Sequence, residues 1–426
     1  MSRPREGWLD TVVRQGLIFP TTPKPDGTTV NYWNEAAWYE FTLDEVESLE
    51  AVTEELWGMC VGAVSWMAAN LDDARLGLPP GSVEYARRSI ERGDPSVYGR
   101  FDFCYYGVGS DAKLMELNGD TPTGLIETGV SQWRWLEDVM PEQDQWNSVH
   151  ERLVERWRDL KDSGAIPYDT VHFLWNDADD SGEEEMTVHY MRDCATQAGL
   201  TTYGQPIQHI QWDSDPSRRG FYDSMGQPIV CAYKLYPWEL MLGETFGRHL
   251  IDRDEIREVR WIEPAWKVLL STKALLPVLW EMYPGHPNLL PAYFDEPRDL
   301  GSWIAKPLHG REGDNIRIHV DDGSEDIVTS DGGYGAEGYV FQQWCPLPSM
   351  DGNRPMLGSW VIDGQAAGMI VRESDGPVTD YFSRVVPHAI GDGLHPDAEQ
   401  QQLWLADRTG ANPQPTLERQ DDRSLG

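Results

Sequence analysis

The spacing of hydrophobic residues predicts helices in the N-terminal part of the chain. Thr42 followed by Glu45 has the pattern of a capping box, and hydrophobic residues then recur at helical spacing as far as Ala63. A second helix is expected to begin at Thr121–Pro122, because proline is favoured in the first turn. Both helices would present an apolar face to a core.

Two short strands are predicted between these helices. Residues 99–106 and 112–118 carry strand-like patterns, and the glycine-containing segment 107–111 is typical of a tight connection. Side chains alternate between the two faces of a strand, so each of these strands has one polar and one apolar face. The segment 99–118 is therefore expected to form a β-hairpin.

From about residue 170 the pattern becomes an alternation of strands and helices. In order, we expect a strand over 171–175, an acidic loop over 176–185, a helix over 186–198, a strand over 229–234, a helix over 265–280, short strands over 303–306, 315–320 and 339–344, and a hairpin that turns at Asp363–Gly364. Alternation of this kind favours an open α/β sheet. The fold class predicted for the whole chain is α/β with α+β.

Charge narrows the classes of partner. The 426 residues contain 71 Asp and Glu against 35 Lys and Arg, a formal net charge of −36. A field of this sign repels nucleic acids and anionic membranes and attracts cations such as Mg²⁺ or a polyamine. The alternative interpretation is an acidic surface that only favours solubility.

Cysteines and apolar runs indicate the compartment. The five cysteines are far apart and show no metal-ligand spacing, which suits a reducing cytoplasm. The first ten residues lack the apolar region of a secretory signal, and the longest apolar stretch, residues 56–71, is interrupted by polar residues. We therefore expect a cytoplasmic protein without a membrane span.

The hairpin carries the first candidate site. Arg100 and Asp102 share one face of the first strand, and Glu116 and Asn118 share one face of the second. If these faces match, two carboxylates, an amide oxygen and a guanidinium converge, and oxygen donors of this kind suit Mg²⁺ held together with phosphates. The alternative is a solvated sheet face.

Acidic and hydroxyl residues suggest contacts to other groups. Residues 119–124 lead into the expected helix, whose free N–H groups could bind an anion, although an ordinary N-cap explains the same pattern. Glu183 and Glu184 follow a predicted parallel strand, where ligand sites of open α/β sheets lie, and could face an amine. They could equally complement the dipole of the helix that they begin.

The second half of the chain supplies candidate phosphate ligands. Lys306 ends a strand, and residues 307–315 form a glycine-containing loop that could approach phosphate oxygens or be a surface hairpin. The loop lacks the P-loop and protein kinase motifs, so both classes are disfavoured. Lys273 lies among apolar residues, where a lysine more commonly extends its charge to water than binds a ligand.

Taken together, these segments resemble one known family. The likeness is carried, in this order, by residues 99–104, 113–121, Glu183–Glu184, 271–277, 306–311 and 341–344. They resemble the synthetase domain of glutathionylspermidine synthase from about Phe41 to Ile390. The resemblance implies an ATP-grasp fold with a pre-ATP-grasp subdomain and a ligase that joins a carboxylate to an amine through an acyl phosphate while splitting ATP to ADP and phosphate.

The resemblance also implies roles for individual residues. The implied metal ligands are Asp102, Glu116 and Asn118, and the implied ATP contacts are Lys273, Lys306, the loop residues Gly310, Arg311, Gly313 and Asn315, and the adenine-pocket residues Gln342, Gln343 and Trp344. Arg100 and Arg372 would stabilise the acyl phosphate, Arg100 also binding substrate. Thr121, Thr123, Glu183 and Glu184 would face the peptide and amine substrates. The cofactors would be ATP and Mg²⁺.

The same resemblance implies domain boundaries, and it identifies two positions at which this sequence differs from the family pattern. We expect an N-terminal helical and hairpin part carrying the metal motif (1–168), a pre-ATP-grasp α/β subdomain (169–260), an ATP-grasp nucleotide-binding part (261–393) and a polar tail (394–426). Two family positions differ, because Leu235 replaces a threonine and Arg384 replaces an acidic residue used for the polyamine. The substrate pair is therefore expected to be a peptide or amino-acid carboxylate and a polyamine-like or other amine.

Two other functions remain open on the sequence. One is a nucleotide-binding regulator that keeps the fold without ligase activity. The other is a glycoside hydrolase that uses paired carboxylates and some of the 19 tryptophans, but it has no use for Lys273, Lys306 and Arg311.

Overall fold

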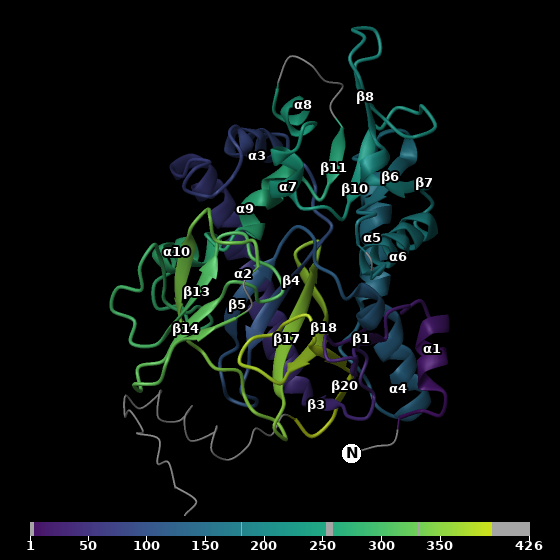
Figure 1. The fold of residues 1–426 in the computed structure, drawn as a ribbon. Helices are drawn as coiled ribbons and strands as arrows, with labels where there is room; N and C mark the ends of the chain where they lie inside the picture. The colour runs from purple at the N-terminus through teal and green to yellow at the C-terminus, as the bar shows by residue number, and fades with distance from the viewer. Residues whose placement is uncertain (1–3, 180, 253–258, 330–331, 394–426) are drawn as a thin grey trace, which may run out of the picture.

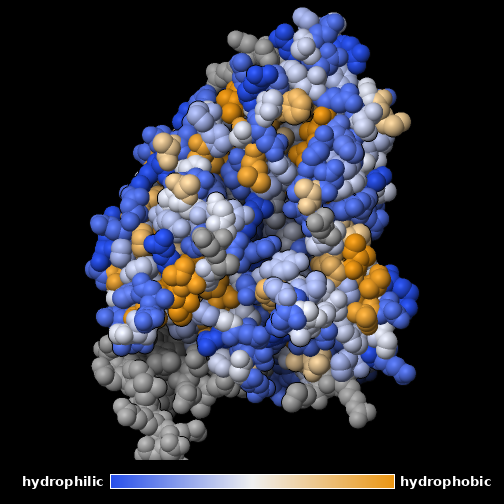
Figure 2. Space-filling model, in the orientation of Figure 1, coloured by the Kyte–Doolittle hydropathy of each residue, from blue (hydrophilic) through white to orange (hydrophobic). Residues whose placement is uncertain are grey.

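Three larger sheets organise the computed structural model (Figure 1). It describes residues 4–179, 181–252, 259–329 and 332–393, so the predicted tail over 394–426 lies outside the described residues. Within this part of the chain, none of the helices combines the length and apolar character that a membrane crossing requires. On the face shown in Figure 2, apolar residues lie in small separate groups among hydrophilic ones.

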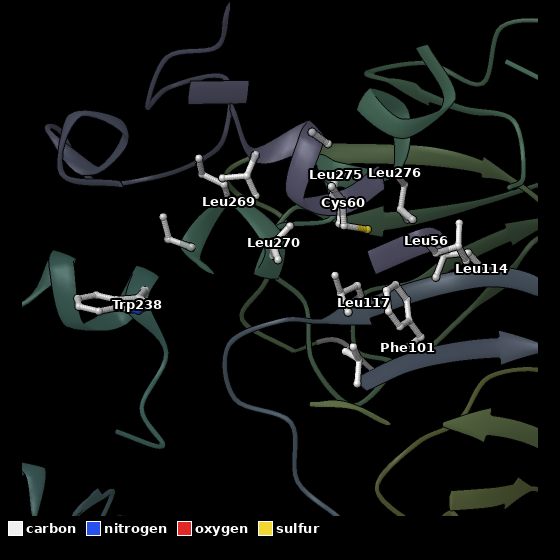
Figure 3. Packing of buried hydrophobic residues seen from close by; sticks show 14 of the residues in the cluster. Leu56, Cys60, Phe101, Leu114, Leu117, Trp238, Leu269, Leu270, Leu275 and Leu276 are labelled. Carbon is white, nitrogen blue, oxygen red and sulfur yellow. The ribbon is translucent and has the colours of Figure 1, made fainter. Parts of the chain in front are cut away.

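The long helix α2 (Leu43–Asn70) begins at the predicted capping box. The backbone N–H of Glu45 donates to the Thr42 hydroxyl at 3.2 Å, and the N–H of Thr42 donates to the Glu45 carboxylate at 2.8 Å. The buried face of the helix, with Leu56 and Cys60, packs in one cluster with apolar residues of the hairpin strands (Figure 3). This burial anchors the strands that carry the candidate metal ligands.

The central sheet contains the predicted hairpin. Its strands are, in spatial order, β19 (Arg384–Val386), β18 (Gln365–Ser374), β17 (Arg354–Ile362), β4 (Tyr98–Cys104) and β5 (Lys113–Asn118). Arg100 pairs with Asn118 and Asp102 with Glu116, so the expected matching of polar faces is confirmed.

The hairpin β17–β18 is also confirmed, since Asp363 and Gly364 have the positive φ angles of 50° and 78° that a two-residue hairpin turn favours. Because β17 pairs with β4, strands of the predicted 1–168 and 261–393 parts share one sheet. The domain boundaries themselves stay a prediction.

A parallel sheet forms the second layer, as the strand–helix alternation predicts. Its order is β11 (Arg260–Ile262), β10 (Cys231–Lys234), β6 (Thr170–Trp175) and β7 (Thr201–Pro206). Helix α6 (Glu183–Gln197) connects β6 to β7 and packs on both. The N-terminus of α6 therefore lies beyond the carboxyl end of β6, where a ligand site was expected.

The third sheet is antiparallel and lies on the left in Figure 1. Its order is β12 (Ala292–Phe294), β16 (Tyr339–Gln343), β13 (Trp303–Pro307), β14 (Arg317–His319) and β15 (Ile327–Val328).

Shorter elements connect and flank the three sheets. Apart from the helices of residues 127–139 and 265–282, which are described below, they are α1 (Trp8–Arg14), β1 (Thr21–Pro23), β2 (Thr29–Asn31), β3 (Tyr39–Phe41), α3 (Ser82–Glu91), α5 (Val149–Asp162), η2 (Pro167–Asp169), η3 (Ile207–His209), β8 (Gln211–Asp213), β9 (Gly220–Tyr222), α7 (Trp238–Gly243), α8 (Gly247–Ile251) and β20 (His388–Ile390).

Two predicted helices differ from the structure. The helix expected from Thr121–Pro122 is wrong at its start, because residues 121–124 are irregular and Gly124 has φ +98°, outside the right-handed helical region. A π-helix, η1 (Glu127–Gln132), and then α4 (Trp133–Val139) follow. π-Helical turns are frequent at functional sites.

The single helix expected over 265–280 is broken into η4 (Ala265–Lys267), α9 (Val268–Ser271) and α10 (Leu275–Met282). The interruption occurs where Thr272 is extended and the Lys273 N–H donates to the Leu308 carbonyl instead of within a helix. Lys273 therefore lies in a break between helices, from which its side chain reaches the site.

Candidate functional site

A cavity of about 440 Å³ is lined by residues of the central and antiparallel sheets and by residues that follow strands β6 and β10 of the parallel sheet. Of the residues singled out from the sequence, it is lined by Arg100, Glu116, Asn118, Thr121, Thr123, Glu183, Glu184, Lys273, Lys306, Gly310, Arg311, Gly313 and Arg372. The other five, Asp102, Asn315, Gln342, Gln343 and Trp344, are outside this lining. The hairpin residues and the lysines of the second half of the chain thus meet in one cavity.

Asp102 lies behind the cavity surface and organises the arginines. Its side chain is fully buried and accepts hydrogen bonds from Arg100 at 2.9 and 3.2 Å, from Asn118 at 2.9 Å and from Arg372 at 2.6 Å. Arg100 also donates to the Thr123 carbonyl at 2.6 Å. One buried carboxylate therefore fixes two guanidinium groups that β4 and β18 supply from opposite ends of the sequence.

Glu116 is surrounded by lysines. The ammonium of Lys273 lies 3.1 Å from the Glu116 carboxylate and donates to the Gly310 carbonyl at 3.2 Å. Burial raises the pKa of Glu116, but the charges of Lys273 and Lys306 outweigh it and lower the pKa to about 2. Glu116 is consequently ionised at neutral pH, as a metal ligand must be.

Lys306 projects from β13 and is almost fully buried. Its ammonium donates to the Met115 carbonyl at 2.8 Å and to the Gln342 side chain at 2.9 Å, while Gln342 in turn donates to the Leu114 carbonyl at 3.0 Å. Burial lowers the pKa of Lys306 to about 8, with Glu116 opposing the shift. Gln342 orients Lys306, whereas contacts of residues 342–344 with adenine stay a prediction.

These groups define a cationic side of the cavity, formed by Arg100, Lys273, Lys306 and Arg372. The four positive charges outnumber the two carboxylates, Asp102 and Glu116, that contact this group directly, and the excess suits an anionic ligand such as phosphate. Glu116 and Asn118 present oxygen donors to the cavity with Asp102 next to them, a donor set that fits Mg²⁺. Among the described residues, no group of three or more His, Cys, Asp and Glu side chains could hold a metal. A magnesium site here therefore depends on the amide of Asn118.

A second, acidic group of lining residues, called the acidic side below, consists of Asp179, Glu183, Glu184, Glu239, Glu312 and Asp380. Burial and the charge of Glu127 raise the pKa of Glu183 to about 7, against a hydrogen bond with Thr123 that lowers it. Burial and the charge of Asp179 raise the pKa of Glu184 to about 7, although Arg311 lowers it. Arg311 donates to Glu239 at 3.0 Å. The lining thus contains a cationic group that suits an anion and an acidic group that suits a cation.

Two buried ion pairs at the site were not predicted from the sequence. Asp120, which lines the cavity, accepts from Lys234 at 2.7 Å, and both side chains are buried. Lys267 lies 3.1 Å from Glu263 and donates to the Gly119 carbonyl at 2.6 Å. Both lysines follow apolar strand or helix patterns, where an isolated lysine is expected to reach solvent. Together they fix residues 119 and 120, where the chain leaves β5 and enters the loop that presents Thr121 and Thr123.

Comparison with known proteins adds independent information. Residues 1–391 match the family model described as glutathionylspermidine synthase preATP-grasp. A Haemophilus influenzae protein named "Putative acid--amine ligase" is 36% identical over 394 residues, which cover 90% of this chain and 97% of that protein.

Two longer relatives match more distantly. The trypanothione synthetase of Crithidia fasciculata is 28% identical over 66% of this chain and 45% of its own length. The bifunctional glutathionylspermidine synthetase/amidase of Escherichia coli is 27% identical over 68% of this chain and 49% of its own length. The matched region spans about half of each of these two proteins.

Among solved structures, a glutathione synthetase-like effector from Globodera pallida superposes with a TM-score of 0.51 at 11% identity, covering 92% of this chain and 98% of that one. At this identity the likeness concerns the fold alone.

Proposed function

The chain belongs to the glutathionylspermidine synthase family, and on that premise we propose that it is an ATP- and Mg²⁺-dependent acid–amine ligase of the ATP-grasp class. One observation carries the proposal. The oxygen donors of the β4–β5 hairpin and the lysines of the second half of the chain line the same cavity, beside two fixed arginines. Amide formation from a carboxylate through an acyl phosphate requires ATP and the carboxylate to be bound side by side in one site.

The chemistry begins with activation of the carboxylate. A carboxylate oxygen attacks the γ-phosphorus of ATP, the bond to ADP breaks, and an acyl phosphate results. Lys273 and Lys306 hold the phosphates, and Glu116, Asn118 and Asp102 would hold Mg²⁺, which supplies screening of phosphate charge. Arg100 and Arg372 neutralise charge on the reacting oxygens. Their guanidinium groups need no reorganisation when substrate arrives, because Asp102 already holds both in place.

Amide formation follows at the acidic side of the cavity. Glu183 and Glu184 attract the cationic amine and place its nitrogen next to the acyl phosphate. After the reacting nitrogen has lost its extra proton to solvent, the neutral amine attacks the acyl carbon, gives up one further proton, and phosphate leaves with the electron pair of the carbon–oxygen bond. The loop carrying Gly310, Arg311 and Gly313 borders the same cavity and closes it against water, which would hydrolyse the intermediate.

The substrate pair is proposed as a peptide or amino-acid carboxylate and a polyamine-like amine. Leu235, where the family pattern has a threonine, lines the cavity and makes that position apolar. Arg384 donates to Asp375 at 2.8 Å and contacts Glu373, outside the lining of the cavity. The amine is therefore recognised mainly by the side formed around Glu183 and Glu184.

The experiment that tests the proposal is a screen for ADP release. Purified protein, ATP and Mg²⁺ are mixed with amino-acid and peptide carboxylates and with mono-, di- and polyamines, and the product is identified by mass spectrometry. We expect ADP release and a new amide only when both an acid and an amine are present. Tight ATP binding without turnover across the panel would instead favour a nucleotide-binding protein without activity.

Replacing Glu116 by glutamine tests the magnesium site. The variant keeps the side-chain shape but loses the charge that Mg²⁺ requires, so the Mg²⁺ concentration for half-maximal ADP release should rise about 100-fold. A Mg²⁺ titration of the rate measures this directly. Glu91→Gln, at an exposed glutamate ending α3, is the matched control and should behave as the parent protein. An unchanged Mg²⁺ requirement in Glu116→Gln would remove Glu116 from the metal site.

A further inference from the structure

A buried carboxylate behind the acidic side has no role in the proposal above. Glu127, the first residue of η1, is only 2% exposed and accepts a hydrogen bond of 2.6 Å from the Tyr32 hydroxyl. Glu127 and Tyr32 are both outside the cavity lining. Burying a carboxylate costs free energy unless hydrogen bonds or charges compensate it, and the Tyr32 hydroxyl supplies one such hydrogen bond.

Packing between η1 and α6 directs Glu183 towards Glu127. A Cβ atom placed on Gly129 of η1 would overlap the Tyr190 hydroxyl of α6. The side chains of Met186 in α6 and of Ile126, just before η1, both lie within 4 Å of the position that a Cβ atom of Gly16 would take. Glu183 lies three residues before Met186 on the same stripe of the helix. The first turn of α6 therefore packs near the first residues of η1, and Glu183 is close enough to Glu127 for their charges to interact while it also lines the cavity.

Electrostatics agree with this placement. Burial raises the pKa of Glu127, against the hydrogen bond from Tyr32 that favours its ionised form. Burial first, and then the charge of Glu127, raise the pKa of Glu183 to about 7. The other groups that act on the three side chains are Asp179 and Glu312 on Glu183, the hydrogen bond of Thr123 on Glu183, Arg100 on Glu127 and Arg372 on Tyr32.

We propose that Glu183 accepts the proton of the attacking amine and that Glu127 and Tyr32 are positioning residues that keep it ready to do so. The inference rests on the proposed ligase function. In the step, the amine nitrogen bonds to the acyl carbon, the carbon–oxygen bond to phosphate breaks, and phosphate leaves with the electron pair. The proton released from nitrogen moves to the Glu183 carboxylate. Hydroxide or a separate cofactor is not needed.

The pH profile of kcat/KM for the amine tests the coupling, with the acid–amine pair that gives the fastest ADP release. In the parent protein the rate should rise with pH through an acidic limb near pH 7, as Glu183 ionises. Glu127→Gln keeps the shape and the Tyr32 contact but removes a negative charge, so the limb should move down by about one pH unit. Tyr32→Phe should move it in the same direction, because Glu127 loses the donor that favours its charge.

Tyr190→Phe is the matched control. It removes a buried hydroxyl from the same helix contact without altering charge near Glu183, so its acidic limb should not move. A purely structural role of Glu127 would lower rates at every pH without moving the limb. Circular dichroism verifies that each variant is folded. If Glu127→Gln does not fold, the shift of the acidic limb is measured in Tyr32→Phe instead.

A second readout needs no turnover. Infrared difference spectra of the parent protein minus Glu183→Gln isolate the titration of the Glu183 carboxyl in the substrate-free protein. Its midpoint should fall by the same amount when Glu127→Gln or Tyr32→Phe is introduced into both members of the pair. If no acid–amine pair releases ADP, the proposed function fails while this titration still decides the coupling. Unchanged limbs and midpoints in both folded variants would overturn the inference.

Discussion

Replacing Lys306 by methionine is expected to reduce the rate of ADP release about 1000-fold. Lys306 is 5% exposed and its ammonium is already held by the Met115 carbonyl and Gln342, so in the proposed role it would bind phosphate without reorganisation. Methionine fills similar space but offers neither charge nor donor. Initial rates of ADP release at saturating acid and amine measure the loss, and ATP binding by calorimetry separates binding from turnover.

Arg317→Met is the control for this experiment. Arg317 lies on the neighbouring strand β14, is exposed, and faces the Tyr339 ring rather than the cavity. The Arg317→Met substitution removes a cation from the same sheet. We expect it to change the rate of ADP release by no more than about twofold, as for surface substitutions away from a site. A Lys306→Met variant as active as Arg317→Met would contradict the role given to Lys306.

Replacing Lys234 by methionine should destabilise the protein by about 3–5 kcal/mol, because it leaves the Asp120 carboxylate buried without its partner. Both side chains are inaccessible and the ion pair is 2.7 Å long. Burial lowers the pKa of Lys234 and raises the pKa of Asp120, because each charged group loses its hydration, while the charge of each partner opposes the shift of the other. Urea unfolding followed by tryptophan fluorescence measures the change.

The double variant Lys234→Met, Asp120→Leu supplies the control. It removes both charges, so part of the lost stability should return, since an apolar pair of similar volume is about as stable as a buried ion pair, although the Trp238 N–H loses Asp120 as its acceptor. If the single variant unfolds at the same urea concentration as the parent protein, Lys234 does not compensate Asp120. Activity is not the readout, because Asp120 borders the cavity.

Much of the fold was predictable where a local pattern determines it. Thr42 and Glu45 start α2 because the two residues satisfy each other's backbone groups without help from the rest of the chain. The register of Arg100 with Asn118 follows from alternation, since a slip by one residue would expose the apolar faces of both strands. Asp363–Gly364 turns a hairpin for a similarly local reason.

Other features depend on contacts between distant segments. The helix start at Thr121 failed because Arg100 binds the Thr123 carbonyl and Gly124 takes a left-handed conformation, neither of which a proline signal reveals. Likewise, the break at Lys273 depends on the Leu308 carbonyl. In such places the tertiary contact overrides local propensity.

The residue types of the candidate site were predictable from the sequence, but which side chains line the cavity and which are buried behind it was less predictable. Asp102 and Glu116 are equivalent in a hairpin pattern, yet Asp102 is buried beneath two arginines while Glu116 faces the cavity. Burial depth is set by β17 and β18, which the local sequence of the hairpin does not encode. Glu127 escaped notice because an acidic residue near a helix start is usually explained by the helix dipole.

The pairing of β4 with β17 has a consequence for synthesis. A ribosome adds residues from the N-terminus onward, so β4 has one open edge until the late strands arrive, and Arg372 joins Asp102 across 270 positions of chain. Non-local pairings of this kind form slowly, and unpaired edges invite association between nascent chains. Translation that stops before residue 354 would therefore release a polypeptide whose exposed β-edge is a target for chaperones and in which Asp102 lacks its partner Arg372.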